Sequence, residues 1–241
     1  MIGWHTDNPL SKTVLGSIPG IELRHIREFN LCESRPDRAM FKPHIFYGIL
    51  RGCGRAIHIL NGMIDWYYID NGYFDAEYVD ADMRKDMSGK FRIVKNGMHE
   101  VFPREPKYSI GPIEKVLIIP PSPYSANFYD TTSEDWTASV VGVINQQSGI
   151  SVPIVRIRTK QAKTSLEDDL KWCDAVVAFN SMAVLRATAM EIPAYDTHGI
   201  FRNFPKLWES CAVYDIKDLR AFYEPKQFTL EEIRRGKVEW N

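Results

Sequence analysis

The sequence has few cysteines, no long apolar run and no signal peptide pattern. Its four cysteines form no CxxC pair, which argues against a zinc site and against a disulfide framework. No apolar stretch approaches the ~20 residues that a membrane-spanning helix needs. The first residues, MIGWHTDNPL, lack the basic and then apolar order of a secretory signal. We therefore expect a cytoplasmic protein with reduced thiols and no membrane span.

The chain also lacks an excess of charge and several catalytic motifs. Lys and Arg number 30 against 31 Asp and Glu, so nucleic acid could bind only through a local basic patch. The motifs G-x-S-x-G, G-x-x-x-x-G-K-[ST] and G-x-G-x-x-G are absent, which removes the main support for a hydrolase, a kinase or a dehydrogenase. The histidines show no H-x-E or H-E-x-x-H spacing, and we expect no metal.

Strands and helices alternate through the second half of the 241 residues. Apolar runs predict strands at residues 115–120, 152–158, 175–179 and 192–195. Helix patterns lie between them, at residues 133–147, 165–173 and 181–190. This alternation predicts an α/β fold with a parallel sheet whose two faces are both covered.

The first half is less regular. Strand patterns lie at residues 55–60, 65–70 and 91–95, and the proline-rich stretch 103–112 is the candidate linker. Near the C-terminus, Thr229 and Glu232 have the spacing of a capping box. We predict lobes at residues 1–110 and 111–205, followed by a segment at 206–241 whose helix packs back on the first lobe.

Polar residues follow three of the predicted strands in the second half. In such sheets ligands bind beyond the carboxyl ends of the strands. Hydroxyls and backbone N–H groups at a helix start, next to two cations, would suit a diphosphate. The alternative for each residue is an ordinary cap or a solvated strand end. The candidates are Ser122, Arg158, Lys160, Asn180 and Ser181.

The order of these segments resembles the donor-binding domain of GT-B-type glycosyltransferases. It is most similar to capsule and lipopolysaccharide sugar transferases and to small bacteriophage-encoded, DNA-modifying glycosyltransferases. The matching parts are the basic loop 158–160, the helix 166–173, the strand that enters Asn180-Ser181, and the small-residue helix 182–193. YYIDNGYFD and FRIVKNGMH in the first half resemble paired motifs of the phage group.

This resemblance implies two Rossmann-like lobes, with the acceptor on the first and the donor on the second. It implies a nucleotide-sugar as substrate, and neither a cofactor nor a metal. Many relatives carry an acid on the helix after Asn-Ser, where it can hold a ribose. This chain has Arg186 at that place, so we count Arg186 among the donor-binding candidates, and the helix-ending glycine is Glu191.

The first half supplies the candidates for proton transfer and acceptor binding. A transferase that inverts the sugar needs a base for the acceptor hydroxyl, and we favour Asp70, which follows an apolar run. The alternative is that Asp70-Asn71-Gly72 only marks a turn. The basic stretch downstream contains Arg92, Lys95 and His99, which could hold an acceptor or a phosphate. His5 and Asp7, in the loop near the start of the chain, are further candidates.

The function predicted from the sequence is transfer of a sugar from a nucleotide-sugar to a hydroxyl. The phage resemblance suggests a 5-hydroxymethylated pyrimidine in DNA as acceptor, by analogy alone. A surface-polysaccharide sugar transferase and a sugar-nucleotide epimerase are the alternative enzymes. The alternative outside enzymes is a nucleotide- or DNA-binding protein with a degenerate donor domain, which the Arg186 departure favours.

Overall fold

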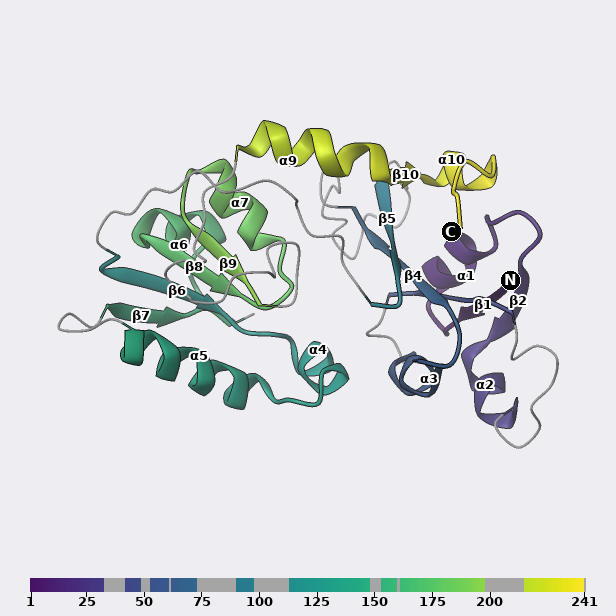
Figure 1. Cartoon of the computed structure of the whole chain (residues 1–241), viewed down its shortest axis with the longest axis horizontal. Helices are drawn as coiled ribbons and strands as arrows, with labels where there is room; N and C mark the ends of the chain where they lie inside the picture. The colour runs from purple at the N-terminus through teal and green to yellow at the C-terminus, as the bar shows by residue number, and fades with distance from the viewer. Residues whose placement is uncertain are drawn as a thin grey trace. The chain divides into compact units, whose positions relative to one another are not determined.

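The computed structural model of the chain divides into two compact units. One comprises Met1–His99 with Tyr223–Asn241, and the other Glu100–Phe222. The residues that the structure describes are 1–32, 42–48, 53–60, 62–72, 90–97, 113–147, 153–159, 161–197 and 215–240. Figure 1 shows the elements of both units.

The first unit is built on a six-stranded sheet in the order β10-β5-β4-β3-β1-β2. The strands β2, β1, β3 and β4 are parallel neighbours, whereas β5 pairs antiparallel with β4, and β10 pairs antiparallel with β5. Strand β10, from the end of the chain, pairs with β5 and so completes the sheet of the N-terminal half. The strands are β1 (Ile2–His5), β2 (Glu22–His25), β3 (His44–Tyr47), β4 (Trp66–Asn71), β5 (Lys90–Lys95) and β10 (Gln227–Thr229).

Helices cover both faces of this sheet. The core on one face joins residues of α1 and α10, such as Val14 and Ile233, to Ile45 and Ile69 of the strands. On the other face Trp4 contacts Phe29 edge to face, with ring centroids 5.2 Å apart. In Figure 1 α2 and α3 lie on the side opposite α10. The helices are α1 (Pro9–Leu15), α2 (Ile26–Cys32), α3 (Gly54–Leu60) and α10 (Leu230–Arg234), with a short 3-10 helix at Glu224–Lys226 before β10.

The strand predicted at residues 55–60 is wrong, because this segment is the helix α3. Its buried residues are Ala56, Ile57 and Leu60, a spacing that gathers on one side of a helix but not on one face of a strand. The strands predicted at 65–70 and 91–95 are confirmed within one residue as β4 and β5. The linker predicted at 103–112 lies outside the described residues.

The second unit contains a four-stranded sheet in the order β7-β6-β8-β9, with every pair parallel. The α/β class and the parallel sheet predicted for this half are confirmed, and all four predicted strands are present. The strands are β6 (Lys115–Ile119), β7 (Ile154–Ile157), β8 (Ala175–Ala178) and β9 (Ala194–Asp196). The helices are α4 (Pro123–Phe128), α5 (Ser133–Gln147), α6 (Leu166–Trp172), α7 (Ala183–Ala189) and α9 (Ile216–Tyr223).

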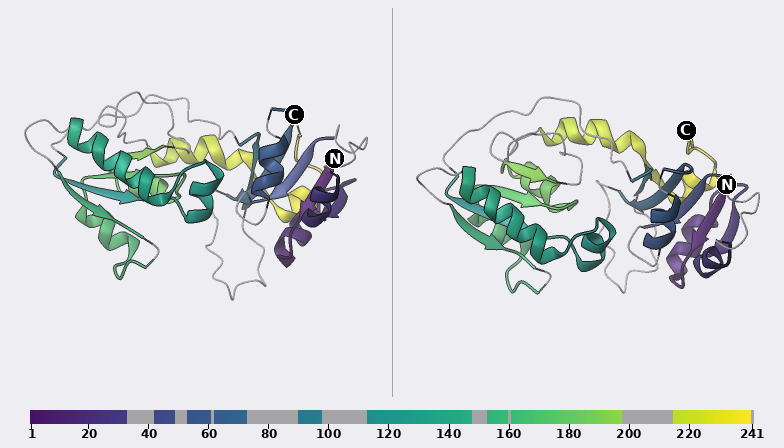
Figure 2. Two further views of the ribbon diagram at one scale, coloured as in Figure 1. Left: turned by 90° about the horizontal axis from the view of Figure 1, so that it is seen from below. Right: turned by 60° about the horizontal axis from the view of Figure 1, so that its bottom comes forward.

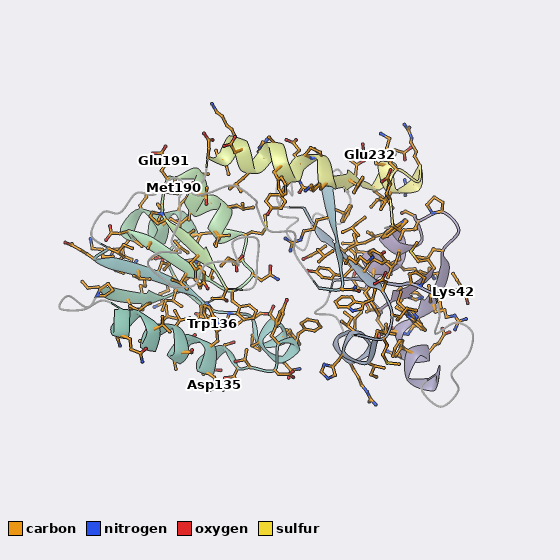
Figure 3. All side chains as sticks on the ribbon, in the orientation of Figure 1. Lys42, Asp135, Trp136, Met190, Glu191 and Glu232 are labelled. Carbon is orange, nitrogen blue, oxygen red and sulfur yellow. The ribbon has the colours of Figure 1, made fainter. Side chains whose placement is uncertain are left out.

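The second sheet is covered on both faces, as its continuous apolar strands predict. Figures 1 and 2 show α5 on one face and α6 on the other. Trp136 of α5 is buried against the sheet in a cluster with Val116 and Val177. Figure 3 labels Trp136 on the side of α5 that faces the sheet. The Trp136 ring contacts the Phe179 ring edge to face, with ring centroids 5.6 Å apart. Among the helices of the described residues, none is long and apolar enough to cross a bilayer.

The two sheets share one strand order. In each, the first strand lies between the second and the third, as β2-β1-β3-β4 in the first unit and β7-β6-β8-β9 in the second. The order reverses beside the first strand, and the loops that leave such a point diverge to opposite faces of the sheet. The carboxyl ends of β1 and β6 are therefore the places where a ligand would be expected.

The predicted capping box at α10 is confirmed. Thr229 Oγ1 accepts a hydrogen bond from the Glu232 backbone N–H at 3.2 Å, and Glu232 Oε2 accepts one from the Thr229 N–H at 3.0 Å. Both bonds lie where β10 passes into α10, and the α10 residues Leu230 and Ile233 are part of the core. The cap therefore fixes the last strand and helix of the first unit.

We expect Thr229→Ala to lower the free energy of unfolding by about 1 kcal/mol, since an orphan helix N–H loses its acceptor. Urea denaturation measures the change. The control is Thr159→Ala, because Thr159 is exposed and its side chain makes no hydrogen bond with the residues that the structure describes, so its effect should stay within about 0.5 kcal/mol. Equal stability of the two variants would show that the cap contributes nothing.

Candidate functional site

The loops after three strands of the second sheet meet at one edge. The Arg158 backbone N–H donates to the Ile118 carbonyl at 2.8 Å, and the Phe179 N–H donates to the Ile119 carbonyl at 3.3 Å. These bonds continue the parallel ladders past the ends of β7 and β8. The structure thus brings four predicted donor-binding residues to the same carboxyl edge, whereas Lys160 lies outside the described residues. The four are Ser122, Arg158, Asn180 and Ser181.

The loop after β8 is held by a buried carboxylate. Asn180 has a positive φ of 45°, a conformation that asparagine tolerates better than most residues. Its backbone N–H donates to the carboxylate of Asp196, which is 2% exposed at the end of β9. Asp196 was not among the residues predicted from the sequence, although an acid at the end of a short apolar strand is a signal that could have indicated it.

The hydroxyl oxygens of both serines at this edge accept backbone hydrogen bonds, but only Ser122 is the N-cap of its helix, because the N-cap of α7 is Met182. Ser122 Oγ accepts from the Ser125 N–H at 3.1 Å at the start of α4, and Ser181 Oγ accepts from the Ala183 N–H at 3.3 Å before α7. The hydroxyl of Ser181 still has a proton to donate to a ligand. Arg186 lies further along α7 with an exposed side chain. Its role towards a ribose stays a prediction.

Arg158 is paired with a buried acid of α6. Its Nη1 donates to Asp169 Oδ2 and, at 2.9 Å, to the carbonyl oxygen of Thr164. Arg156 Nη1 reaches the other oxygen of Asp169 at 2.9 Å, and its guanidinium lies 3.8 Å from the Trp172 ring centre. The alternative of a solvated strand end does not hold for Arg158, because its side chain is 19% exposed and ties β7 to α6.

This pairing leaves part of the Arg158 guanidinium unused. All its hydrogen bonds to Thr164, Ser165 and Asp169 are made by Nη1. Within the described part of the chain, no hydrogen bond uses its Nε or Nη2. Arg158 can therefore serve the fold through one nitrogen and a ligand at the sheet edge through the other two.

The charge of Asp169 depends on its partners. Its side chain is 1% exposed, and burial by itself would raise the pKa. Hydrogen bonds from Thr164, Arg158 and Arg156 outweigh burial and lower the pKa of Asp169 below its usual value. The carboxylate is thus charged at neutral pH, as pairing with two guanidinium groups requires.

In the first unit, Asp70 lies at the carboxyl edge of β4, as predicted, but it is paired. Arg92 Nη2 donates to Asp70 Oδ2 at 3.0 Å, and the two residues are directly opposite each other on β4 and β5. The Arg92 side chain is 9% exposed and that of Asp70 is 41% exposed. The structure therefore joins the predicted base to one of the predicted phosphate ligands.

Lys95 lies at the opposite edge of the same sheet from Asp70, where β4 begins. It is opposite Tyr67, near the start of β4, and it forms an ion pair with Asp65 at 3.0 Å. The hydrogen bond that Lys95 donates to Asp65 raises the pKa of Lys95. The structure does not bring Lys95 to Arg92, so the two do not form one basic strip, and His99 lies outside the described residues.

His5, which was expected in a loop, is the last residue of β1, and Asp7 lies in the segment that follows it. Both belong to a cluster of which the sequence predicted only these two members. His25, at the end of β2, places Nε2 3.0 Å from Asp7 Oδ1, and Arg27 Nη2 donates to Asp7 Oδ2 at 2.6 Å. The rings of His5 and His25 contact each other, with centroids 4.9 Å apart. His25 and Arg27 were missed because they lie 20 residues further along the chain. In the described ranges, no group of three or more His, Cys, Asp or Glu side chains could hold a metal ion.

Comparison with protein-family models gave no match, and comparison with curated proteins gave none either. Among solved structures, the chain is similar to KpsC of Thermosulfurimonas dismutans, a β-Kdo 2,7-transferase. The match covers 97% of each chain at 9% sequence identity, with a TM-score of 0.46.

We expect Arg158→Met to lower the free energy of unfolding by about 1.5–3 kcal/mol, because hydrogen bonds to a charged group are lost at a buried carboxylate. Chemical denaturation at pH 7 measures the loss. The control is Arg235→Met, which removes the exposed pair with Glu231 and should cost at most about 1 kcal/mol. Equal losses in the two variants would contradict a structural role for Arg158.

We also expect the contribution of the Asp169 carboxylate to the free energy of unfolding to vanish in acid. Because the folded pKa of Asp169 lies below the unfolded value of ~3.9, its contribution is present in full above that value and disappears as the pH falls through the folded pKa. The measurement is the difference in unfolding free energy between wild type and Asp169→Asn, from pH 7 down to pH 3. A difference that does not shrink towards low pH would contradict this account.

Proposed function

We propose that the protein is a metal-independent glycosyltransferase that moves a sugar from a nucleotide-sugar to a hydroxyl acceptor. The donor diphosphate binds at the carboxyl edge of the second sheet. The observation that carries this proposal is the convergence there of Arg158, with two unused guanidinium nitrogens, and the loop Asn180-Ser181.

The chemistry of a diphosphate suits this edge. A guanidinium donates two parallel hydrogen bonds to phosphate oxygens, and such charge-assisted bonds are roughly twice as strong as neutral ones. Asp169 holds the guanidinium, and Asp196 holds the loop after β8. Binding therefore needs little ordering of these groups, which favours affinity.

An exposed aromatic ring beside this edge would suit the nucleobase. Tyr124 is 71% exposed on α4, two residues after Ser122. A base that stacks on such a ring gains about 1–3 kcal/mol. We propose Tyr124 as the stacking surface.

In this proposal the first unit supplies the acceptor side and the proton acceptor. Removal of the proton from the acceptor hydroxyl by a positioned side chain is worth typically about 10²–10⁴-fold in rate. Asp70, His5 and Asp7 all lie at the carboxyl edge of the first sheet or just beyond it. A glycan and a hydroxymethylated base in DNA both offer the required hydroxyl.

Isothermal titration calorimetry with uridine, guanosine and cytidine diphosphates tests the donor site, each with and without a chelator. We expect one of the three to bind, and its affinity to be unchanged by the chelator. Absence of binding by all three would contradict the proposed function. Binding without any release of nucleoside diphosphate from nucleotide-sugars would instead favour a non-catalytic nucleotide-binding protein.

The variants Arg158→Lys and Arg156→Lys form a matched pair. Both variants keep a positively charged side chain beside Asp169, but only Arg158→Lys removes the unused guanidinium nitrogens at the sheet edge. We expect Arg158→Lys to weaken diphosphate binding by about 1.5–3 kcal/mol, the scale of hydrogen bonds to a charged group. Arg156→Lys should bind as the wild type does. Equal affinities for the two variants would remove Arg158 from the donor site.

A further inference from the structure

We propose that the buried pair of Trp4 and His44 is an acid-sensitive latch for helix α2 of the first unit. The neutral His44 ring keeps α2 packed on the sheet, and uptake of a proton by His44 favours release of the helix. The latch lies within the first unit and is independent of the proposed donor site of the second unit.

The His44 ring is bonded to Trp4 in the core of the first sheet. Trp4 of β1 donates its indole Nε1–H to Nδ1 of His44 on β3 at 2.7 Å. The angle between the two rings is 18°, so the N–H and the lone pair of Nδ1 lie close to one plane. Trp4 is 2% exposed and His44 is 1% exposed. The hydrogen bond therefore joins two neighbouring strands out of contact with water.

This hydrogen bond exists only while His44 is neutral. An indole nitrogen donates but does not accept, so Nδ1 must keep its lone pair and the ring hydrogen lies on Nε2. The second proton of a histidinium goes to Nδ1, where two N–H groups would then face each other. The new charge would also be buried, which is costly unless it is paired. Acid therefore acts against the bond between Trp4 and His44.

Helix α2 packs on these two rings through Phe29. The Phe29 ring contacts the Trp4 ring edge to face, with centroids 5.2 Å apart, and the His44 ring with centroids 6.2 Å apart. Phe29 is 2% exposed, whereas Arg27 and Glu28 of the same helix are exposed. Separation of Trp4 from His44 therefore removes the surface on which the buried ring of α2 packs.

Uncharged rings pack on the His44 imidazole. Trp4 and Phe29 contact it, and Trp66 lies directly opposite it on β4. Trp66 is 2% exposed, so this side chain also belongs to the core. These three rings supply no opposite charge, so burial among them favours the neutral form of His44.

Charged groups of the neighbouring elements, among the described residues, are paired or lie nearer the surface. The Asp65 carboxylate, before β4, is paired with Lys95. Cys53, before α3, is buried, and burial raises the pKa of its thiol to about 12, so it stays neutral. The Tyr67 and Tyr68 hydroxyls of β4 are neutral near pH 6. The other titratable side chains described on β1, β4, α2 and α3 are half-buried or exposed: His5, Asp70, Arg27, Glu28, Arg55 and His58.

The pH range of the latch follows from the ordinary behaviour of histidine. An exposed histidine has a pKa of ~6.5. When α2 is released and the bond to Trp4 is broken, His44 takes up a proton in this range, whereas the packed state resists it. A change from pH 7.5 to pH 5.5 therefore raises the ratio of released to packed molecules about tenfold, because only the released state gains the proton.

The first turn of α2 also reaches the carboxyl edge of β1. Arg27 Nη2 donates to Asp7 Oδ2 at 2.6 Å. Release of α2 separates Arg27 from Asp7, so a proton in the core changes the charge at the edge where a ligand is expected. His25 is a second titratable group of this turn, because its Nδ1 accepts from the Arg27 backbone N–H at 3.2 Å. The experiments must therefore separate His44 from His25.

Histidine ¹⁵N NMR of the full chain at pH 8 tests the bond itself. We expect His44 to carry its hydrogen on Nε2. The variant Trp4→Phe should change the ¹⁵N shift of His44 Nδ1, because the donor is lost. A His44 ring that carries its hydrogen on Nδ1 would overturn the proposal.

Hydrogen–deuterium exchange of the full chain, read by mass spectrometry, follows the helix at pH 7.5 and pH 5.5. Rates are divided by the intrinsic exchange rate at each pH. In the wild type we expect the protection of the α2 amides to fall about tenfold, by the ratio derived above. Protection of α1, which packs on the opposite face of the sheet, should stay the same. Unchanged protection of α2, or an equal fall in α1, would contradict the latch.

The variants His44→Asn and His58→Asn form a matched pair. The oxygen of Asn lies near the place of Nδ1 and can accept from Trp4, but it takes up no proton in this range. We expect the protection of α2 to be independent of pH in His44→Asn. His58 is exposed on α3, so His58→Asn should respond as the wild type does. A tenfold fall that persists in His44→Asn would overturn the proposal.

The variant His25→Asn separates the two histidines even where His44→Asn does not fold. A wild-type fall in α2 protection in His25→Asn supports His44 as the proton acceptor of the latch. Loss of the pH response in His25→Asn would assign the response to the first turn of α2 and overturn the proposal.

Discussion

Parallel pairing of one central strand with a neighbour on each side governs both candidate sites. In the first unit this strand is β1, and in the second it is β6. Parallel strands end at the same edge, so residues from distant parts of the chain arrive side by side. His5 meets His25 in this way, and Arg158 comes to the same edge as Asn180. The chemistry proposed for each unit follows from that constraint.

The buried carboxylate of Asp169 links the stability of the second unit to the proposed donor site. Burying a charge is costly unless it is paired and hydrogen-bonded, and here two guanidinium groups and a threonine hydroxyl supply the partners. One of these partners is Arg158, which also lies at the sheet edge. The same contact therefore holds α6 on the sheet and leaves two N–H-bearing nitrogens without a hydrogen bond among the described residues. Asp196 acts in a similar way on the loop at Asn180.

Sequence patterns identified the second unit better than the first, for a physical reason. The strands β6 and β8 are buried, so their residues are almost all apolar, and helices with clear caps separate them. The strands β1, β2 and β3 are only four residues long and contain glycine, arginine and histidine, so no strand period stands out. The helix α3 was taken for a strand because seven residues hold too few turns to show a helical period. Strand β10 has three residues, and only its pairing with β5 defines it.

The sequence by itself determined the α/β class, the alternation of strands and helices along the second half of the chain, the capping box at Thr229, and which residues follow the strand ends. These are local properties, set by apolar periodicity and by side chains that bond to backbone a few residues away. The tertiary structure decided which charged side chains pair with one another. It paired Arg158 with Asp169, Asp70 with Arg92 and His25 with Asp7, and it placed Lys95 on the edge opposite Asp70. Those pairings depend on strand register and on helix packing between segments up to 22 residues apart, for which no short sequence pattern exists.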